Sequence, residues 1–165
     1  MINFPTQEQV LMRAEKWKQT GKIIVFTNGV FDILHAGHVA YLDSARRLGH
    51  KLIVGLNGDQ SVEHLNKGRE RPVNKILSRC AVLSALRMVD RVLVFHEDTP
   101  LEMIKRIKPD VLVKGGDYDA DESNPSSKKY IVGSKEVKEY GGKVVVIPLL
   151  EGFSTTAIVE RLRTS

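Results

Sequence analysis

Residues 23–38 read IIVFTNGVFDILHAGH, and this stretch decides the fold of the chain. The run 22–27 at its start is β-branched and aromatic and has the length of a strand, and Asn28-Gly29 then predicts a tight turn. From His38 onward, apolar residues recur at three-residue steps, which predicts a helix that buries one face. We therefore expect a buried strand, a turn and a helix, in that order.

Two histidines, His35 and His38, stand three residues apart at the predicted start of this helix. A helix start carries free N–H groups and the positive end of the helix dipole, so it favours a phosphate. Gly37 removes a side chain where a phosphate would need close approach. The alternatives are ordinary surface or core histidines, or a zinc pair, but no Cys or Glu follows at ligand spacing. The pattern favours two imidazoles aimed at one anion.

The strand, turn and helix carry a longer motif, T-x-G-x-F-D-x-x-H-x-G-H, which resembles the signature of the cytidylyltransferase-like nucleotidyltransferases. Its residues in this chain are Thr27, Gly29, Phe31, Asp32, His35, Gly37 and His38. Over about residues 22–163 the chain is also similar to the heptose 1-phosphate adenylyltransferases of that family. The segments that carry this closer likeness are RPVN (71–74), EDTP (97–100), LVKGGDY (112–118), GSKEV (133–137) and GFSTT (152–156). Val30 departs from it, because relatives often carry Cys there.

Length and composition predict one globular domain over residues 1–165, with an N-terminal helix at 6–20 and a catalytic core at 22–163. Hydrophobic residues make up 42% of the chain and charged residues 27%, which is typical of soluble proteins. No apolar run approaches the roughly 20 residues of a membrane span, and the N-terminus lacks the apolar region of a secretory signal. We therefore expect a cytoplasmic protein with no membrane partner, and we interpret the single Cys80 as a buried structural thiol.

Strand-like and helix-like segments alternate along the chain. This predicts an α/β fold, a single Rossmann-like domain whose five-stranded parallel sheet carries helices on both faces. The strands are expected at 22–27, 51–56, 91–95, 110–113 and 143–147. A long helix is expected at 74–89, and a capping box at 99–102 is expected to open the next helix. The polar segment 118–130 is expected to be a loop.

Parallel sheets bind ligands at the carboxyl ends of their strands. The segments 28–38, 57–59, 114–117 and 151–156 should therefore open on the same edge of the sheet. By residue type alone, the Ser-Thr-Thr segment at 154–156 is either a helix cap or a phosphate-binding site. The double glycine at 115–116 is either a turn or a stretch of exposed backbone that contacts a nucleotide base. The resemblance implies that these segments bind the nucleotide through Val30, Phe31, Asp32, His35, Gly37, His38, Lys114, Gly115, Gly116, Asp117, Gly152, Phe153, Ser154, Thr155 and Thr156.

Positive charge is concentrated at 67–79, where five basic residues occur with one acid. The whole chain carries a net charge of +5, and this local cluster suits a nucleoside triphosphate better than a nucleic acid. The alternative is a solvated charged turn. We predict that Arg71 and Arg79 stabilise the leaving pyrophosphate and act with His35 and His38 in catalysis. The predicted substrate-binding residues are Asp59, Lys67 and Arg69.

The resemblance implies a reaction in which AMP passes from ATP to a sugar 1-phosphate, heptose 1-phosphate, and gives ADP-heptose and pyrophosphate for lipopolysaccharide precursor synthesis. It also implies Mg²⁺, or another divalent cation, bound with ATP; the sequence names no protein ligands for it. Two alternatives stay open: a CTP-dependent enzyme acting on glycerol 3-phosphate or a similar small phosphate, and a nucleotide-binding sensor without catalysis. No nucleic-acid partner is expected, and a homodimer is one compatible assembly.

Overall fold

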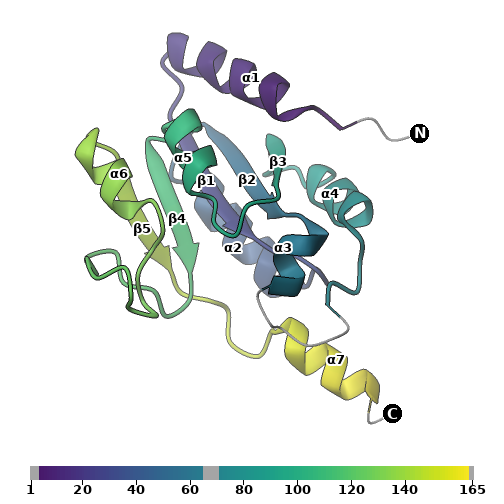
Figure 1. The fold of residues 1–165 in the computed structure, drawn as a ribbon. Helices are drawn as coiled ribbons and strands as arrows, with labels where there is room; N and C mark the ends of the chain where they lie inside the picture. Colours follow the sequence, from purple (N-terminus) through teal and green to yellow (C-terminus); the bar gives the residue numbers. More distant parts are fainter. Residues whose placement is uncertain (1–3, 65–70, 164–165) are drawn as a thin grey trace.

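A computed structural model describes residues 4–64 and 71–163, and its centre is one parallel sheet (Figure 1). The five strands lie in the order β3-β2-β1-β4-β5, and each pairs in parallel with its neighbours. Their bounds are Ile24–Gly29 (β1), Lys51–Asn57 (β2), Arg91–Phe95 (β3), Val111–Gly115 (β4) and Lys143–Ile147 (β5). The predicted five-stranded parallel sheet is confirmed.

Helices cover both faces of the sheet, as predicted, and each face has its own apolar core. Residues of α2 and α4 pack on one face, and residues of α1, α5 and α6 pack on the other. Cys80 belongs to the first core and is buried, as predicted. The helices are Gln7–Gln19 (α1), Ala36–Arg46 (α2), Asp59–His64 (α3), Ile76–Ser84 (α4), Leu101–Ile107 (α5), Ser134–Glu139 (α6) and Thr155–Arg163 (α7).

The order of the strands reverses beside β1. The chain builds β1, β2 and β3 outward in one direction, then crosses back to place β4 on the other side of β1. In such sheets a ligand crevice opens at the carboxyl ends of the strands where the order reverses. The loops after β1 and β4 therefore border the expected site.

Three local predictions from the sequence are wrong: a strand end, a helix length and a capping box. β1 continues through Asn28 and Gly29, so Asn28 lies within a strand and does not start a turn. The helix predicted at 74–89 covers only Ile76–Ser84, because the N–H groups of Leu86 and Val89 bond to carbonyls three residues back in successive turns. The capping box at 99–102 does not form, since α5 has Pro100 at its N-cap and no side-chain cap.

The N-terminal helix α1 is fixed by a capping box that does form, between Thr6 and Gln9. It buries Val10 and Ala14 and contacts β3, at one edge of the sheet, and α5. Within residues 4–64 and 71–163, no helix is both long and apolar enough to cross a membrane.

Candidate active site

The two histidines of the motif lie together at the start of α2. His35 is the N-cap residue, with no side-chain cap bond, and its ring stacks on that of His38 with the centroids 3.8 Å apart. The ring of Phe31 lies 5.4 Å from that of His38. Phe31 has a φ of 45°, a left-handed conformation uncommon for a bulky residue. The backbone thus turns sharply between β1 and the histidines.

Both imidazoles are partly buried. Burial lowers the pKa of His38 to about 4, with a smaller contribution from the charge of His35, and burial also lowers the pKa of His35. The Nδ1 atoms of both rings are buried and have no hydrogen-bond partner among the described residues. Both rings are therefore neutral at pH 7, and each neutral imidazole keeps one N–H to donate.

The start of α7 packs against the histidine loop. The ring of Phe153 stacks on His35 with the centroids 6.3 Å apart, and the Thr155 hydroxyl donates to the carbonyl of Ile33 at 3.4 Å. The structure thus brings residues 153–155 next to residues 33–37. A Cβ on Gly37 would lie 3.0 Å from both Phe153 Cβ and His35 Nδ1. The glycine therefore makes room for these two side chains, whereas the sequence suggested room for a phosphate.

Other residues predicted to bind the nucleotide lie nearby. Ser154 caps α7, because its hydroxyl accepts the N–H of Ala157 at 3.0 Å. Thr156 is exposed in the first turn of α7, and Gly152 is exposed with a φ of 81°. Gly116 follows β4 with a φ of 102°, a conformation that glycine adopts without strain.

Arg79 occupies a different place from the predicted one. Its side chain is fully buried, so it offers no surface to a phosphate in this structure. Its guanidinium donates to three backbone carbonyls and one carboxylate: Val30 O (2.8 Å), Asn57 O (2.9 Å), Asn74 O (2.9 Å) and Asp59 Oδ1 (2.7 Å). Arg79 therefore ties together the loops that follow β1 and β2.

Asp32 and Arg71 form a second link between segments. The Asp32 carboxylate accepts hydrogen bonds from Arg71 Nη1 (3.1 Å) and from the N–H groups of Val73 (2.9 Å) and Asn74 (2.8 Å). Burial alone would raise the pKa of Asp32, but these hydrogen bonds outweigh it and hold the pKa below its usual value. Arg71, 15% exposed in its side chain, is thereby held beside the histidine loop.

Of the three predicted substrate-binding residues, the structure describes Asp59. The Asp59 carboxylate pairs with Arg79 and accepts the N–H of Ile76 at 3.3 Å, so it holds the start of α4. Lys67 and Arg69 lie outside the described residues.

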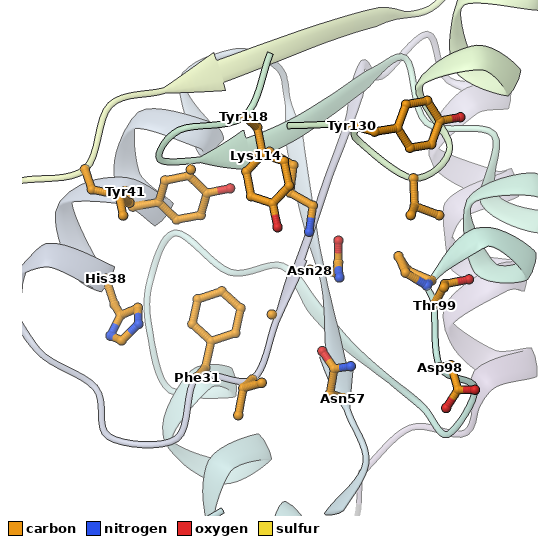
Figure 2. Close-up of a pocket in the computed structure, with 16 residues that line it drawn as sticks. Asn28, Phe31, His38, Tyr41, Asn57, Asp98, Thr99, Lys114, Tyr118 and Tyr130 are labelled. Carbon is orange, nitrogen blue, oxygen red and sulfur yellow. The ribbon is translucent and has the colours of Figure 1, made fainter. Parts of the chain in front are cut away.

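A cavity of about 540 Å³ opens at the carboxyl ends of β1, β2 and β4 (Figure 2). Five predicted residues line it: Val30, Phe31, His38, Lys114 and Gly115. Asp117 is exposed and is not among the lining residues. Three more lining residues, Asn28, Gly29 and Asn57, lie in segments expected at this edge but were not assigned a role. The sequence analysis did not place the other lining residues at the site, namely Tyr41, Asp98, Thr99, Pro100, Tyr118, Tyr130, Val132 and Leu149.

Some of the missed residues carried a usable signal. Asn28 and Asn57 are polar residues at the ends of otherwise apolar strands, and Tyr41 lies three residues after His38, on the same helix face. The Tyr41 hydroxyl shares a buried hydrogen bond of 2.6 Å with Thr27. The residues Tyr118 and Tyr130 had no local signal, because they reach the cavity from a long irregular loop.

The described residues offer little to a metal ion on their own. Among them, no group of three or more His, Cys, Asp or Glu side chains is placed to hold one, and the oxygens of Asp32 already accept three hydrogen bonds. This donor set fits a Mg²⁺ ion that is carried by phosphate oxygens and water, which is how Mg²⁺ commonly binds with nucleotides.

Comparison with known proteins identifies the class. The family model described as cytidylyltransferase-like matches residues 26–161. The chain therefore belongs to the cytidylyltransferase-like family, and the predicted enzyme class, a nucleotidyltransferase, is confirmed.

Two curated relatives are similar to nearly the whole of this chain. The chain is 50% identical over 96% of its length to "Bifunctional protein HldE" of Alcanivorax borkumensis, and 52% identical over 94% to that of Pseudomonas aeruginosa strain LESB58. It spans only 31% of the length of these curated relatives.

Two solved structures are also similar. The lipopolysaccharide core biosynthesis protein from Thermoplasma volcanium GSS1 has a TM-score of 0.59 and 29% identity, over 79% of this chain and 98% of that one. The pantoate-beta-alanine ligase from Francisella tularensis has a TM-score of 0.60 and 16% identity, over 99% of this chain and 77% of that one. The second likeness concerns the fold alone.

The buried position of Arg79 generates a stability prediction. The Arg79→Ala change leaves three carbonyls and a carboxylate without their donor, so it should lower the free energy of unfolding by about 3–5 kcal/mol. Arg47→Ala is the matched control, because Arg47 is exposed and pairs with Asp43 four residues earlier; its effect should stay within about 0.5 kcal/mol. Chemical denaturation measures both. If the Arg79→Ala protein is as stable as the parent but binds ATP more weakly, Arg79 contacts phosphate as the sequence predicted.

The pKa of His38 generates a pH prediction. Folding favours the neutral ring, so the fold should lose stability as pH falls from about 6.5, the ordinary pKa, through about 4, where both states become protonated. NMR titration should show the His38 ring titrating near pH 4 in the free protein. Added pyrophosphate should raise this pKa, because an adjacent anion favours the charged ring. Titration near pH 6.5 without a ligand would contradict the described burial.

Proposed function

We propose that this chain transfers the adenylyl group of ATP to a sugar 1-phosphate, heptose 1-phosphate, and releases pyrophosphate. The observation that carries the proposal is the stacked, neutral histidine pair at the start of α2, with His38 lining a cavity at the strand ends. The likeness to heptose 1-phosphate adenylyltransferases and to a lipopolysaccharide core biosynthesis protein supports the sugar. Such a reaction would supply precursors for lipopolysaccharide in the cytoplasm, where ATP is available.

The chemistry needs little from the protein beyond alignment and charge stabilisation. A phosphate oxygen of the sugar phosphate attacks the α-phosphorus of ATP, and the bond from that phosphorus to the bridging oxygen of the β-phosphate breaks. The electron pair leaves with pyrophosphate. The attacking oxygen is already ionised at neutral pH, so no general base is required. Catalysis then depends on holding the two phosphates in line and on neutralising the charge that develops.

The histidines act as hydrogen-bond donors in this scheme. The N–H of His38 would donate to a non-bridging oxygen of the α-phosphate, where negative charge increases in the transition state. The rings of His35 and Phe153 stack in sequence and hold the His38 ring in place. A donor fixed in a partly buried position is stronger than one in solution.

The remaining elements would position the phosphates. The N-terminus of α2, which has no side-chain cap, offers backbone N–H groups to the α-phosphate. Lys114 lines the cavity, and Arg71 is held near the histidine loop by Asp32. Mg²⁺ would enter with ATP and neutralise charge on its phosphates. Arg79 would act only through the loops it holds.

The direct test compares pyrophosphate release with ATP and with CTP, each offered heptose 1-phosphate or glycerol 3-phosphate. We expect turnover with ATP and heptose 1-phosphate. Turnover only with CTP and glycerol 3-phosphate would favour the cytidylyltransferase alternative, and ATP binding without turnover would favour the sensor.

Replacement of His38 separates catalysis from stability. His38→Ala should lower kcat by about 10²–10³, the loss seen when one preorganised donor to a developing oxyanion is removed, while ATP still raises the melting temperature. The matched control is His50→Ala. The ring of His50 accepts the N–H of Ile23 at 3.0 Å, at the opposite end of the sheet, so its loss should lower stability and leave kcat unchanged. Normal kcat in a folded His38→Ala protein would contradict the assigned role.

A further inference from the structure

Asn28 is the last side chain of β1 before Gly29 and lines the cavity at the centre of the sheet edge (Figure 2). It pairs in register with Gly55 of β2. A Cβ on Gly55 would lie 3.1 Å from the Cβ of Asn28, so the glycine leaves room for this side chain. The amide is thereby held at the end of a strand, which is a more rigid support than a loop.

The amide oxygen of Asn28 is buried and has no hydrogen-bond partner among the described residues. A buried acceptor without a partner destabilises the folded state, and such groups are rare in folded proteins. A hydrophobic residue of similar size would avoid this destabilisation. The position of the amide beside an open cavity indicates that a ligand supplies the missing partner.

Asn57 ends the neighbouring strand β2 and lines the same cavity. Its amide nitrogen donates to the Ser61 hydroxyl at 2.9 Å, and that hydroxyl donates to the carbonyl of Glu97 at 3.2 Å. This chain of hydrogen bonds fixes the orientation of the Asn57 amide. Two neutral amides, each able to accept and at least one able to donate, therefore stand at adjacent strand ends.

The two ends of the cavity carry different groups. Figure 2 shows His38 on one side and Asp98 on the opposite side, with Asn28, Asn57 and Lys114 between them. A phosphate is held best by cations and helix N-termini, and the N-terminus of α2 lies on the His38 side. Neutral amides suit hydroxyl groups, because hydroxyls both donate and accept.

The position of the amides in the cavity indicates which substrate they meet. Figure 2 shows Phe31 between His38 and the two asparagines, so Asn28 and Asn57 lie beyond Phe31 from the histidine that the proposed function places on the α-phosphate. We propose that Asn28, supported by Asn57, recognises the hydroxyl groups of the acceptor sugar and selects a polyhydroxylated sugar phosphate. This inference rests on the proposed function, and it assigns the acceptor side of the same site.

The test is Asn28→Ala, assayed with ATP and heptose 1-phosphate. The kcat/KM for heptose 1-phosphate should fall by about ten- to a hundredfold, and the KM for ATP should stay within about twofold, because only acceptor contacts are lost. The melting temperature of the free protein should stay the same or rise, since a buried amide oxygen without a partner has been removed. Replacing a residue that merely supported the fold would instead lower the melting temperature. Asn28→Leu, which has a similar volume and lacks the acceptor oxygen, should show the same selective loss for the acceptor.

The matched control is Asn124→Ala, in the exposed loop outside the cavity, where the side chain accepts the N–H of Ser126; its kinetics should equal those of the parent. Unchanged acceptor kinetics in both Asn28 variants would overturn this inference and leave the proposed function standing. A rise confined to the KM for ATP would also overturn it and assign Asn28 to the nucleotide. A parent protein inactive with every sugar phosphate would overturn both proposals.

Discussion

The buried guanidinium of Arg79 is the constraint on which the shape of the site depends. A charged group out of water is tolerated only when its donors are paired, and here the partners include the carbonyls of Val30 and Asn57, at the ends of β1 and β2. These carbonyls cannot move without exposing an unpaired charge. The cavity floor between the two strands is therefore fixed, and so is the sharp turn at Phe31 that leads to the histidines.

Buried polar groups with hydrogen-bond partners and those without them lie in different parts of this protein. Arg79 and Asp32, outside the cavity lining, are fully engaged with other parts of the chain. In contrast, Asn28 Oδ1, His35 Nδ1 and His38 Nδ1 are buried without partners among the described residues. Unsatisfied polar groups and strained backbone commonly gather at functional sites, where a ligand compensates for them. Burial, which keeps His38 neutral in the free protein, leaves it ready to become a stronger donor beside an anion.

Local patterns were sufficient to predict the parallel sheet, the histidine pair and the buried Cys80, because strand length, helical spacing and a contiguous motif lie within short windows. Arg79 was assigned to phosphate because its neighbours in sequence are basic, yet its partners Val30 and Asn57 lie 49 and 22 residues away. Charge clustering in a sequence does not show which cations are buried. Asn28 was interpreted as a turn residue within the segment expected at the ligand edge, although its strand continues one residue further.

Phosphorus-31 NMR of a mixture of the protein, Mg²⁺, ATP and heptose 1-phosphate tests the central claim most directly, because it identifies which phosphorus atom is attacked. Attack at the α-phosphorus predicts inorganic pyrophosphate together with a new pair of coupled diphosphate resonances from ADP-heptose, in equal amounts. The appearance of ADP with a heptose bisphosphate would show attack at the γ-phosphorus instead. That result, or an unchanged spectrum, would contradict the assignment of the histidine pair and its cavity to adenylyl transfer.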